Sequence, residues 1–422
     1  MLNCTGFGCI IKALYILSEK GPRIMKLYDF DKYIDRTKTT SIKHAFKEEY
    51  HVPADVIPLW VADMDFRSPD EVCQAVEEAG HFGIFGYSSP KEDYYHAVIN
   101  WLTRRHNWTP KEDWLICTPG VVCAISIAVK ALTAPGDAVM IMQPVYHPFK
   151  NAVVRNERTL VENPLLLGED HRFYMDFEKI EAQFAKEKVK LLILCTPHNP
   201  GGRVWTKEEL ERLIDLCLKY QVKVIADEIH HDFVFPGHKH TEFAPLNKDM
   251  QENCIICTAP SKTFNIAGLG LSNIFIPNKE LRTAFQKELD CTGLDIVNLV
   301  SMEACKAAYS HGEDWLEQLL IYIKQNSDYV QNFLAENLPQ ITMMPLDGTY
   351  LAWLDFSGLQ MSQEALNDFL LNKAKIWLNS GDIFGMGGEG HMRLNIGCPR
   401  SVLERAMEQL NISVKELLHT LS

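Results

Sequence analysis

The 422-residue sequence lacks several features that would assign it to a broad class of proteins. No apolar run reaches the roughly 18 residues of a membrane-spanning helix, so we expect no membrane span. Positive charge is also in the minority, because 42 Lys and Arg face 55 Asp and Glu, a formal net charge of −13. Such a chain repels nucleic acid and anionic membranes, so we expect neither as a partner. An anionic ligand must then be bound by a local pocket.

The 12 cysteines show no short repeating spacing, which argues against a disulfide scaffold. They are typical of reduced thiols, and we expect a cytoplasmic protein. Cys254 and Cys257 form a lone C-x-x-C, but they lie in an apolar run that indicates a buried strand. A reactive thiol needs an exposed, electropositive setting, so we interpret this pair as structural.

The sequence also lacks internal repeats, low-complexity tracts and long linkers. Its hydrophobic content of 46% and charged content of 23% are typical of a globular protein. The length predicts two or three domains. Globular patterning begins near Met25, and we expect residues 1–24 to be a poorly ordered extension.

Short apolar runs alternate with amphipathic stretches in the middle of the chain. Continuous apolar runs of this length suit strands that are buried on both faces, as in a parallel sheet. Thr206 can cap a helix between two of the runs, and Glu209 can complete a capping box. This order predicts an α/β fold, in which helices flank a mostly parallel central sheet and the crossovers are right-handed. The expected strands are 138–142, 191–195, 222–226 and 254–257.

The last third of the chain has a different pattern. Long helical patterns at 315–338 and 363–374 accompany short strand-like pieces at 349–354 and 391–396, which predict a smaller α+β domain. The expected division is residues 25–69 as an N-terminal segment packing with the small domain, 70–300 as the large domain and 301–422 as the small domain.

Four motifs follow predicted strands, at the edge where open α/β sheets bind their ligands. In the first, Gly120 allows a close turn before a helical run, and the free N–H groups of a helix start suit a phosphate. A turn before a helix is more often only structural.

In the second motif, Asn199 lies on a stiff turn rich in Pro and Gly and offers a neutral donor, although a plain loop would have the same composition.

The third motif places Asp227 after a fully apolar strand, so we expect a buried carboxylate that needs a partner. One alternative is a metal, because residues 227–232 contain two His and three carboxylates. However, His230 and His231 are adjacent and cannot easily face one site, so the sequence favours no metal. A cationic ring nitrogen would satisfy a single buried carboxylate better.

The fourth motif places Lys262 after another apolar strand, at the same edge. Read alone, Lys262 is either an ion-pair partner of Asp227 or a nucleophile with a lowered pKa. Together the motifs supply a phosphate cradle, an amide donor, a buried carboxylate and a nucleophilic amine. These groups match the phosphate, ring oxygen, ring nitrogen and aldehyde of pyridoxal phosphate (PLP).

The order of these motifs resembles the fold-type I PLP-dependent enzymes of aminotransferase class I/II. The resemblance rests on Asn-Pro-Gly at 199–201, Asp-Glu-Ile-His at 227–230, Ser-Lys-Thr-Phe-Asn at 261–265 and Arg-Leu-Asn-Ile-Gly at 393–397. It extends from about Tyr28 to the C-terminus. It implies PLP as the cofactor, and a large domain with a mostly parallel sheet beside a smaller α+β domain.

Trp-Val-Ala-Asp-Met-Asp-Phe at 60–66 and Phe-Gly-Tyr-Ser at 85–88 are similar to the MalY/PatB-type cystathionine β-lyase branch. This resemblance implies a carbon–sulfur β-lyase that cleaves L-cystathionine or cysteine-type thioethers by α,β-elimination to pyruvate, ammonia and a thiol. An aminotransferase stays open, because reprotonation of the same intermediate gives that reaction. A regulatory binding protein on this scaffold is a third alternative, although intact Lys262 and Asp227 argue against an idle site.

The resemblance also implies a role for each matching residue. Lys262 would hold the cofactor as a Schiff base and move the Cα proton, and Asp227 would keep the ring nitrogen protonated. Asn199 would contact the ring oxygen and the substrate, and Arg393 would bind the substrate carboxylate. Tyr87 would reach the substrate from a neighbouring subunit and act in catalysis, which implies a homodimer. Further cofactor contacts would come from Tyr146 on the ring face, His230 at the ring oxygen, and Gly120, Val121, Val122 and Ser261 at the phosphate.

Two positions depart from the common aminotransferase pattern. His230 stands where many relatives carry Tyr, and Gly270 stands where many carry an Arg that meets the phosphate. The cationic partner of the phosphate is therefore left open.

Overall fold

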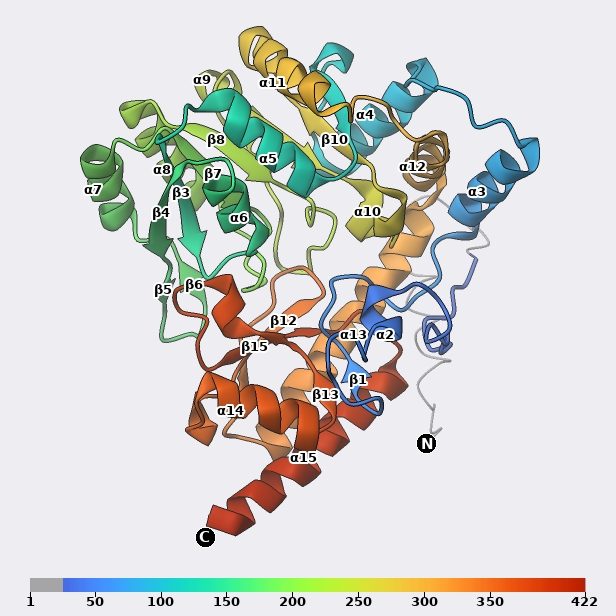
Figure 1. Cartoon of the computed structure of the whole chain (residues 1–422), viewed down its shortest axis with the longest axis vertical. Coiled ribbons are helices and arrows are strands. Elements are labelled where there is room, and N and C mark those ends of the chain that lie inside the picture. Colours follow the sequence, from blue (N-terminus) through green and yellow to red (C-terminus); the bar gives the residue numbers. More distant parts are fainter. Residues whose placement is uncertain (1–25, 422) are drawn as a thin grey trace.

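The computed structural model describes residues 26–421, so the extension expected at residues 1–24 lies outside the described residues. A large α/β part contains a seven-stranded sheet, and a smaller part below it in Figure 1 contains a four-stranded sheet. No helix within residues 26–421 has the length and apolar character needed to span a bilayer.

The large sheet has the strand order β2-β10-β9-β8-β7-β3-β4, and its pairs are parallel except the two that involve β10. The mostly parallel sheet predicted from the apolar runs is confirmed, and all four expected strands are present to within one residue at each end. The strands are β2 (Leu115–Thr118), β3 (Ala138–Gln143), β4 (Thr159–Pro164), β7 (Leu191–Cys195), β8 (Lys223–Asp227), β9 (Cys254–Thr258) and β10 (Ser272–Phe275).

Successive side chains of these strands enter two different hydrophobic cores. In β7, Ile193 packs in the core beneath α5, α6 and α11, whereas Leu192 and Leu194 face the larger core on the other side. This two-sided burial explains why the runs are apolar throughout. Cys254 and Cys257 lie in β9 in different cores, and burial raises the pKa of both thiols. The structure thus places the C-x-x-C pair inside the sheet.

Helices cover both faces of the large sheet (Figure 1). The predicted capping box opens α8: Thr206 Oγ1 accepts from the Glu209 N–H at 3.2 Å, and Glu209 Oε2 accepts from the Thr206 N–H at 2.8 Å. The helices of this part are α3 (Asp70–Phe82), α4 (Glu92–His106), α5 (Val121–Leu132), α6 (Pro148–Val154), α7 (Phe177–Glu187), α8 (Lys207–Tyr220), α9 (Lys248–Gln251), α10 (Pro260–Thr263), α11 (Lys279–Thr292) and α12 (Leu299–His311). A short hairpin joins β5 (Leu166–Leu167) to β6 (Phe173–Tyr174).

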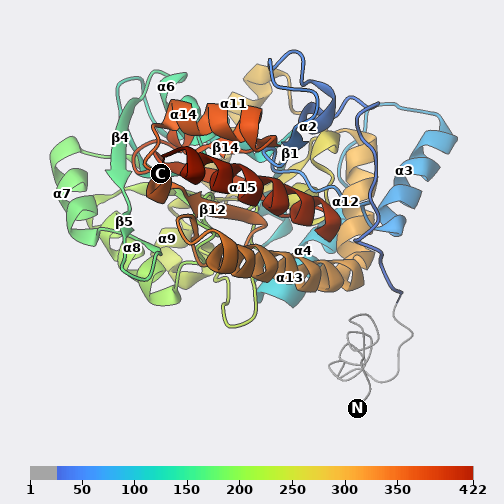
Figure 2. The ribbon, with the colours of Figure 1, turned by 90° about the horizontal axis from the view of Figure 1, so that it is seen from below.

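The small sheet is antiparallel, in the order β11-β12-β15-β14. Its strands are β11 (Thr342–Met343), β12 (Leu351–Asp355), β14 (Asn379–Ser380) and β15 (His391–Asn395), and its helices are α13 (Glu313–Asn337), α14 (Gln363–Asp368) and α15 (Arg400–Leu421). Figure 2 shows α13 and α15 side by side across one face of this sheet. The helix expected at 363–374 is not uniform, because α14 ends at Asp368 and a π-helical turn follows over Phe369–Lys373.

The N-terminal segment contacts the small part. It contains α2 (Ile42–Ala45) and β1 (Ile57–Pro58), and β1 pairs in parallel with β13 (Ile376–Trp377). This pairing favours the expected packing of residues 25–69, whereas the domain boundaries at residues 69 and 300 stay predictions.

Candidate active site

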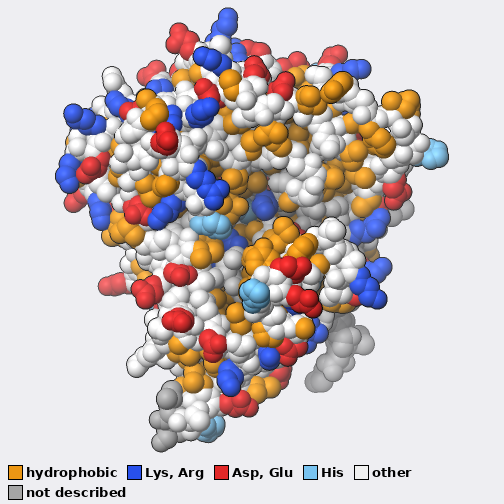
Figure 3. Space-filling view, in the orientation of Figure 1, with side chains coloured by type: hydrophobic (Ala, Val, Ile, Leu, Met, Phe, Trp, Pro, Cys, Tyr) orange, Lys and Arg blue, Asp and Glu red, His pale blue; other side chains and the backbone are white. Residues whose placement is uncertain are grey.

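The chemically active motifs converge at one edge of the large sheet. Asp227 is the last residue of β8, Lys262 lies in α10 just beyond β9, and Asn199 lies in the turn after β7. Because these strands are parallel, their carboxyl ends share the edge that faces the small sheet (Figure 1). Figure 3 shows the surface hollowed between the two parts, with Lys or Arg side chains at the base of the hollow.

Asp227 is a buried carboxylate that lacks a fully compensating partner. It is 3% exposed, and its Oδ1 accepts the backbone N–H of Ile229 at 3.2 Å. Burial raises the pKa of Asp227 to about 7, although this N–H and the positive charge of Lys262 act in the opposite direction. A cationic N–H beside this carboxyl would lower its pKa and favour the ionised form. The protonated ring nitrogen of PLP is such a cation.

Lys262 is arranged as a nucleophile. Its Nζ donates to the Ala62 carbonyl at 2.8 Å. Among the described residues, Asp227 acts on Lys262 only through its charge, without an ion-pair contact. Burial lowers the pKa of Lys262 to about 8, against the opposing charges of Asp63 and Asp227. A substantial fraction of the amine is therefore neutral near pH 8, which favours the nucleophile over the ion-pair partner.

The N-terminus of α5 forms an open cradle beside these residues. No side chain caps the helix, and a Cβ added at Gly120 would meet no atom within 4 Å. This space and the free N–H groups at Val121 and Val122 suit a phosphate. Ser261 lies in the neighbouring helix α10, partly buried. The backbone at Gly270 is left-handed, with φ +63°, and an added Cβ would lie 3.3 Å from the Pro119 carbonyl, so this position disfavours any larger side chain.

Arg393 is a buried cation whose partners are all neutral. It lies in β15, 4% exposed, and its Nη1 donates to Asn199 Oδ1 at 3.0 Å. Its Nη2 donates to the Trp60 carbonyl at 3.0 Å and to Asn379 Oδ1. Its buried Nε has no hydrogen-bond partner, and burial lowers the pKa of Arg393 to about 10. A buried, uncompensated guanidinium is suited to binding a substrate carboxylate, and a surface ion pair is excluded.

Two further predicted contacts lie in the same region. The backbone N–H of Tyr146 donates to the Asn199 carbonyl at 3.1 Å, which joins the loops after β3 and β7. His230 is buried, and burial lowers its pKa to about 3, so its ring is neutral at physiological pH. Its Nδ1 has no hydrogen-bond partner, which leaves it available to a ligand oxygen.

The segment 60–66 lies against Lys262 and is held there by two of the family motifs. Its Ala62 carbonyl accepts from both Lys262 Nζ and Tyr350 Oη, at 2.8 and 2.9 Å. Asn265 donates to the Met64 and Phe66 carbonyls and accepts from the Met64 N–H, all at 2.8–2.9 Å. Asn395 Nδ2 donates to the carbonyls of residues 61 and 63, at 2.6 and 2.7 Å.

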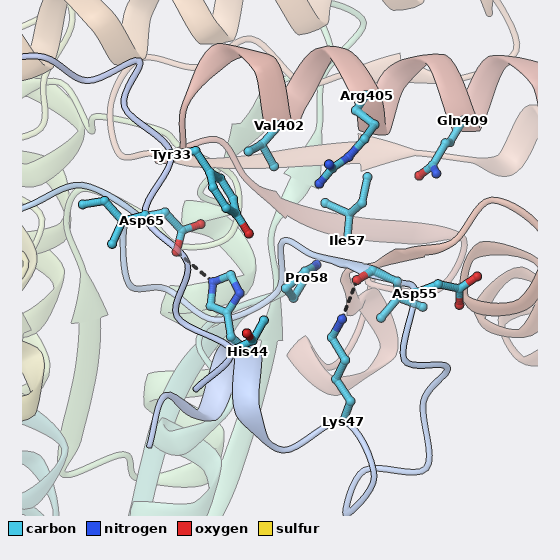
Figure 4. Close-up of a pocket in the computed structure, with 13 residues that line it drawn as sticks. Tyr33, His44, Lys47, Asp55, Ile57, Pro58, Asp65, Val402, Arg405 and Gln409 are labelled. Atoms are coloured by element: carbon cyan, nitrogen blue, oxygen red, sulfur yellow. Dashed lines mark hydrogen bonds and ion pairs between the residues drawn. The ribbon is translucent and has the colours of Figure 1, made fainter. Parts of the chain in front are cut away.

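Asp65 anchors the same segment from its other side. Its carboxylate contacts Lys43 Nζ at 2.7 Å, Arg36 Nη1 at 2.8 Å and His44 Nε2 at 3.0 Å, and Figure 4 shows the His44 contact. These charges hold the pKa of Asp65 well below its usual range, so it stays ionised. The segment is thus clamped between the N-terminal region and the active-site edge.

Replacing Asn265 with alanine should loosen this clamp. Three hydrogen bonds of roughly 1 kcal/mol each are lost, so we expect the free energy of unfolding to fall by about 2–3 kcal/mol. Urea denaturation followed by circular dichroism measures this change. The exposed Asn332→Ala change on α13 is a control for asparagine loss in general, and equal destabilisation by both would contradict the assigned role.

Three contacts of the site could not be predicted from the sequence: Tyr350, Asn379 and the Ala62 carbonyl. A backbone carbonyl carries no sequence signal, and Asn379 lies in a short strand without a motif. Tyr350 directly precedes β12, and its contacts with the Ala62 carbonyl and His230 reveal its position.

Tyr87 is not brought to the site within one chain. It is 93% exposed, in the loop between α3 and α4. Phe82, Ile84 and Phe85 in the same region are also exposed. We call residues 82–87 the apolar loop.

Comparison with known proteins assigns the family. Residues 54–410 match the family Aminotransferase class I and II. Cystathionine beta-lyase PatB of Bacillus subtilis (strain 168) is 43% identical over 386 residues, covering 92% of this chain and 100% of PatB. The structure of a PLP-bound putative aminotransferase from Clostridium difficile 630 has a TM-score of 0.89 at 41% identity, covering 92% of this chain and 100% of that chain. Cystalysin from Treponema denticola, which contains a pyridoxal 5'-phosphate cofactor, has a TM-score of 0.90 at 39% identity, covering 93% and 100%.

These matches cover nearly all of the described chain and agree with the motifs at the sheet edge. The chain belongs to the aminotransferase class I and II family and, within it, to the MalY/PatB-type branch.

Proposed function

We propose that the protein is a PLP-dependent carbon–sulfur β-lyase that cleaves L-cystathionine or a cysteine-type thioether to pyruvate, ammonia and a thiol. The observation that carries this proposal is the convergence of a nucleophilic Lys262, a buried Asp227 and an uncompensated Arg393 at one sheet edge. The curated relative PatB is named a cystathionine β-lyase, and the similar structure of cystalysin contains PLP.

The residues at this edge fit PLP group by group. Asp227 would hold a proton at the ring nitrogen, and the N-terminus of α5 would bind the phosphate. Asn199 uses its oxygen to accept from Arg393, which leaves its NH2 group for the ring oxygen. When bound, PLP supplies an electron sink next to the substrate Cα.

The chain's own groups perform the remaining steps. Arg393 would bind the α-carboxylate and thereby orient the amino acid. Lys262 Nζ would accept the Cα proton, after which the Cβ–S bond breaks and the thiolate leaves with the bonding pair. The leaving sulfur takes up a proton to become the thiol, and addition of water to the remaining fragment gives pyruvate and ammonia.

The product balance distinguishes this activity from transamination. With L-cystathionine and no 2-oxo acid, we expect pyruvate and homocysteine to appear in equal amounts over many turnovers. An aminotransferase would release no thiol and would need an acceptor such as 2-oxoglutarate for continued turnover. Acceptor-dependent formation of glutamate without thiol release would contradict the proposed lyase.

The pH dependence of cofactor loading follows from the pKa of Lys262. Only the neutral amine can attack the PLP aldehyde, and the pKa of Lys262 is lowered to about 8. We expect the rate of PLP uptake by the cofactor-free protein to rise with pH and to level off above about pH 8. Stopped-flow absorbance at saturating PLP measures it, and a rate that still rises tenfold per pH unit above pH 9 would indicate an unshifted lysine.

We propose that two chains share their active sites in a homodimer. The exposed apolar loop at residues 82–87 has the composition of an interface, and Tyr87 at its end would reach the partner's site. Mixing the Lys262→Ala and Tyr87→Ala variants should then create one intact site per mixed dimer. After exchange of subunits, we expect about a quarter of wild-type activity from two nearly inactive parents. A mixture no more active than its parents would contradict shared sites.

We also propose that the protein is cytoplasmic. The described cysteines are all free, and most of them are buried, which suits a reducing compartment. Cell fractionation with an antibody against the native protein tests this location.

A further inference from the structure

A second group of polar residues lies beyond β8, separate from the residues that would contact PLP. Glu228, His231, His240 and Glu242 each offer one ligand atom, and these atoms all lie within 4.8 Å of one another. All four side chains are buried, the most exposed being His240 at 8%. We call these four residues the His/Glu cluster.

The His/Glu cluster contains polar atoms that the protein itself leaves without partners. Neither ring nitrogen of His240 has a hydrogen bond, and the same holds for His231 Nε2. Buried polar atoms without partners are destabilising, so native structures rarely keep several of them together. Three such nitrogens in one buried cluster therefore indicate a ligand.

One hydrogen bond lies within the cluster, between His231 Nδ1 and Glu242 Oε1 at 2.9 Å. The distances from His240 to the two carboxylates, in contrast, suit a metal ion better than hydrogen bonds. His240 Nε2 lies 3.8 Å from Glu228 Oε1 and 3.8 Å from Glu242 Oε1, too far for hydrogen bonding. Ligand atoms about 2.0–2.1 Å from a tetrahedral zinc ion lie roughly 3.3 Å apart. Two carboxylates and two neutral imidazoles would also balance the charge of one divalent cation, which would relieve the cost of burying both carboxylates.

Surrounding groups hold the ligands in place. The Phe243 N–H donates to Glu228 Oε1 at 2.8 Å. His106, the last residue of α4, places its Nδ1 3.3 Å from Glu242 Oε1, and its ring stacks on that of His231 with centroids 4.0 Å apart. Such outer contacts are characteristic of metal sites. A cavity of about 620 Å³, lined in part by His106, His231 and His240, offers an entry path.

We propose that the His/Glu cluster binds one zinc ion as a structural site that ties residues 228–231, directly after β8, to residues 240–242. The sequence disfavoured a metal because His230 and His231 are adjacent, and the structure separates their roles. His230 lies against Tyr350, whereas His231 lies in the cluster. Two of the ligands, His240 and Glu242, come from beyond the motif at 227–232 that the sequence analysis considered.

The test uses the untagged, PLP-saturated protein and does not depend on its lyase activity. The protein is stripped with chelator, incubated with Zn²⁺, passed through gel filtration and analysed for metal by mass spectrometry. We expect about one zinc per chain in the wild type. We expect less than about a tenth of that in each of His240→Gln and Glu242→Gln, which remove one ligand each. Zinc should raise the Tm of the wild type by several degrees, and Mg²⁺ should not, because it prefers oxygen ligands.

His238→Gln is the matched control, because it makes the same chemical change on the same loop outside the cluster. His238 is partly exposed and lies 3.3 Å from Asp347 Oδ1. It should retain wild-type zinc content. The proposed site is wrong if the wild type retains no zinc and its Tm does not rise when zinc is added. It is also wrong if both ligand variants retain as much zinc as the control. Should the variants fail to fold, the zinc content and Tm shift of the wild type still decide the question.

Discussion

Replacing Lys262 with alanine should lower kcat/KM for L-cystathionine by more than about 10⁴-fold. The variant loses both the amine that holds the cofactor and the group that accepts the Cα proton, and proton transfer alone contributes about 10²–10⁴. The same change removes the hydrogen bond to the Ala62 carbonyl, so the segment 60–66 loses one of its contacts. Steady-state assay of pyruvate measures the effect.

Chemical rescue separates the catalytic role of Lys262 from a structural one. A small primary amine added to the Lys262→Ala variant can replace the missing base, so partial recovery of activity is expected. Lys223→Ala is the matched control, because Lys223 begins β8 at the opposite end from Asp227. A Lys262→Ala variant that keeps wild-type kcat/KM would contradict the assignment of Lys262.

Replacing Asp227 with asparagine should lower kcat/KM by about 10²–10³-fold, the usual effect of removing one preorganised electrostatic contact. Asparagine has nearly the same shape, but it carries no negative charge to hold a proton at the ring nitrogen. The wild-type carboxylate is buried, and among the described residues its hydrogen-bond donor is the Ile229 N–H. Few other groups are therefore available to hold the proton at the ring nitrogen. The variant should also lose PLP more readily on dialysis.

The control for this change is Asp215→Asn, on the exposed face of α8. It should leave both activity and PLP retention unchanged. Far-UV circular dichroism verifies that Asp227→Asn keeps its fold. If the folded variant retained full activity, the ring nitrogen would not depend on Asp227.

The sequence predicted the sheet well because burial on both faces requires continuous apolar runs. Leu191 to Cys195 is one example, and the structure gives β7 the same bounds. The motif residues Asp227 and Lys262 could be found because they are charged residues that follow such strands. Helical periodicity, in contrast, could not distinguish the π-helical turn after α14 from a regular helix.

The contacts that the sequence could not supply depend on the tertiary structure. Asn265 and Asn395 were part of recognised motifs, but their role as clamps of the segment 60–66 follows only from the folded chain. In the proposed dimer, the position of Tyr87 relative to an active site depends on a second chain. His240 and Glu242 were missed because they lie in a loop beyond the motif that drew attention.

The most direct test of the account is to locate the cofactor on the purified protein. Sodium borohydride fixes PLP to the lysine that holds it, and digestion followed by mass spectrometry identifies the modified peptide. The account predicts that the modification lies on Lys262, at the end of β9 where the four motifs converge. Modification of a different lysine, or a protein that cannot be loaded with PLP, would contradict it.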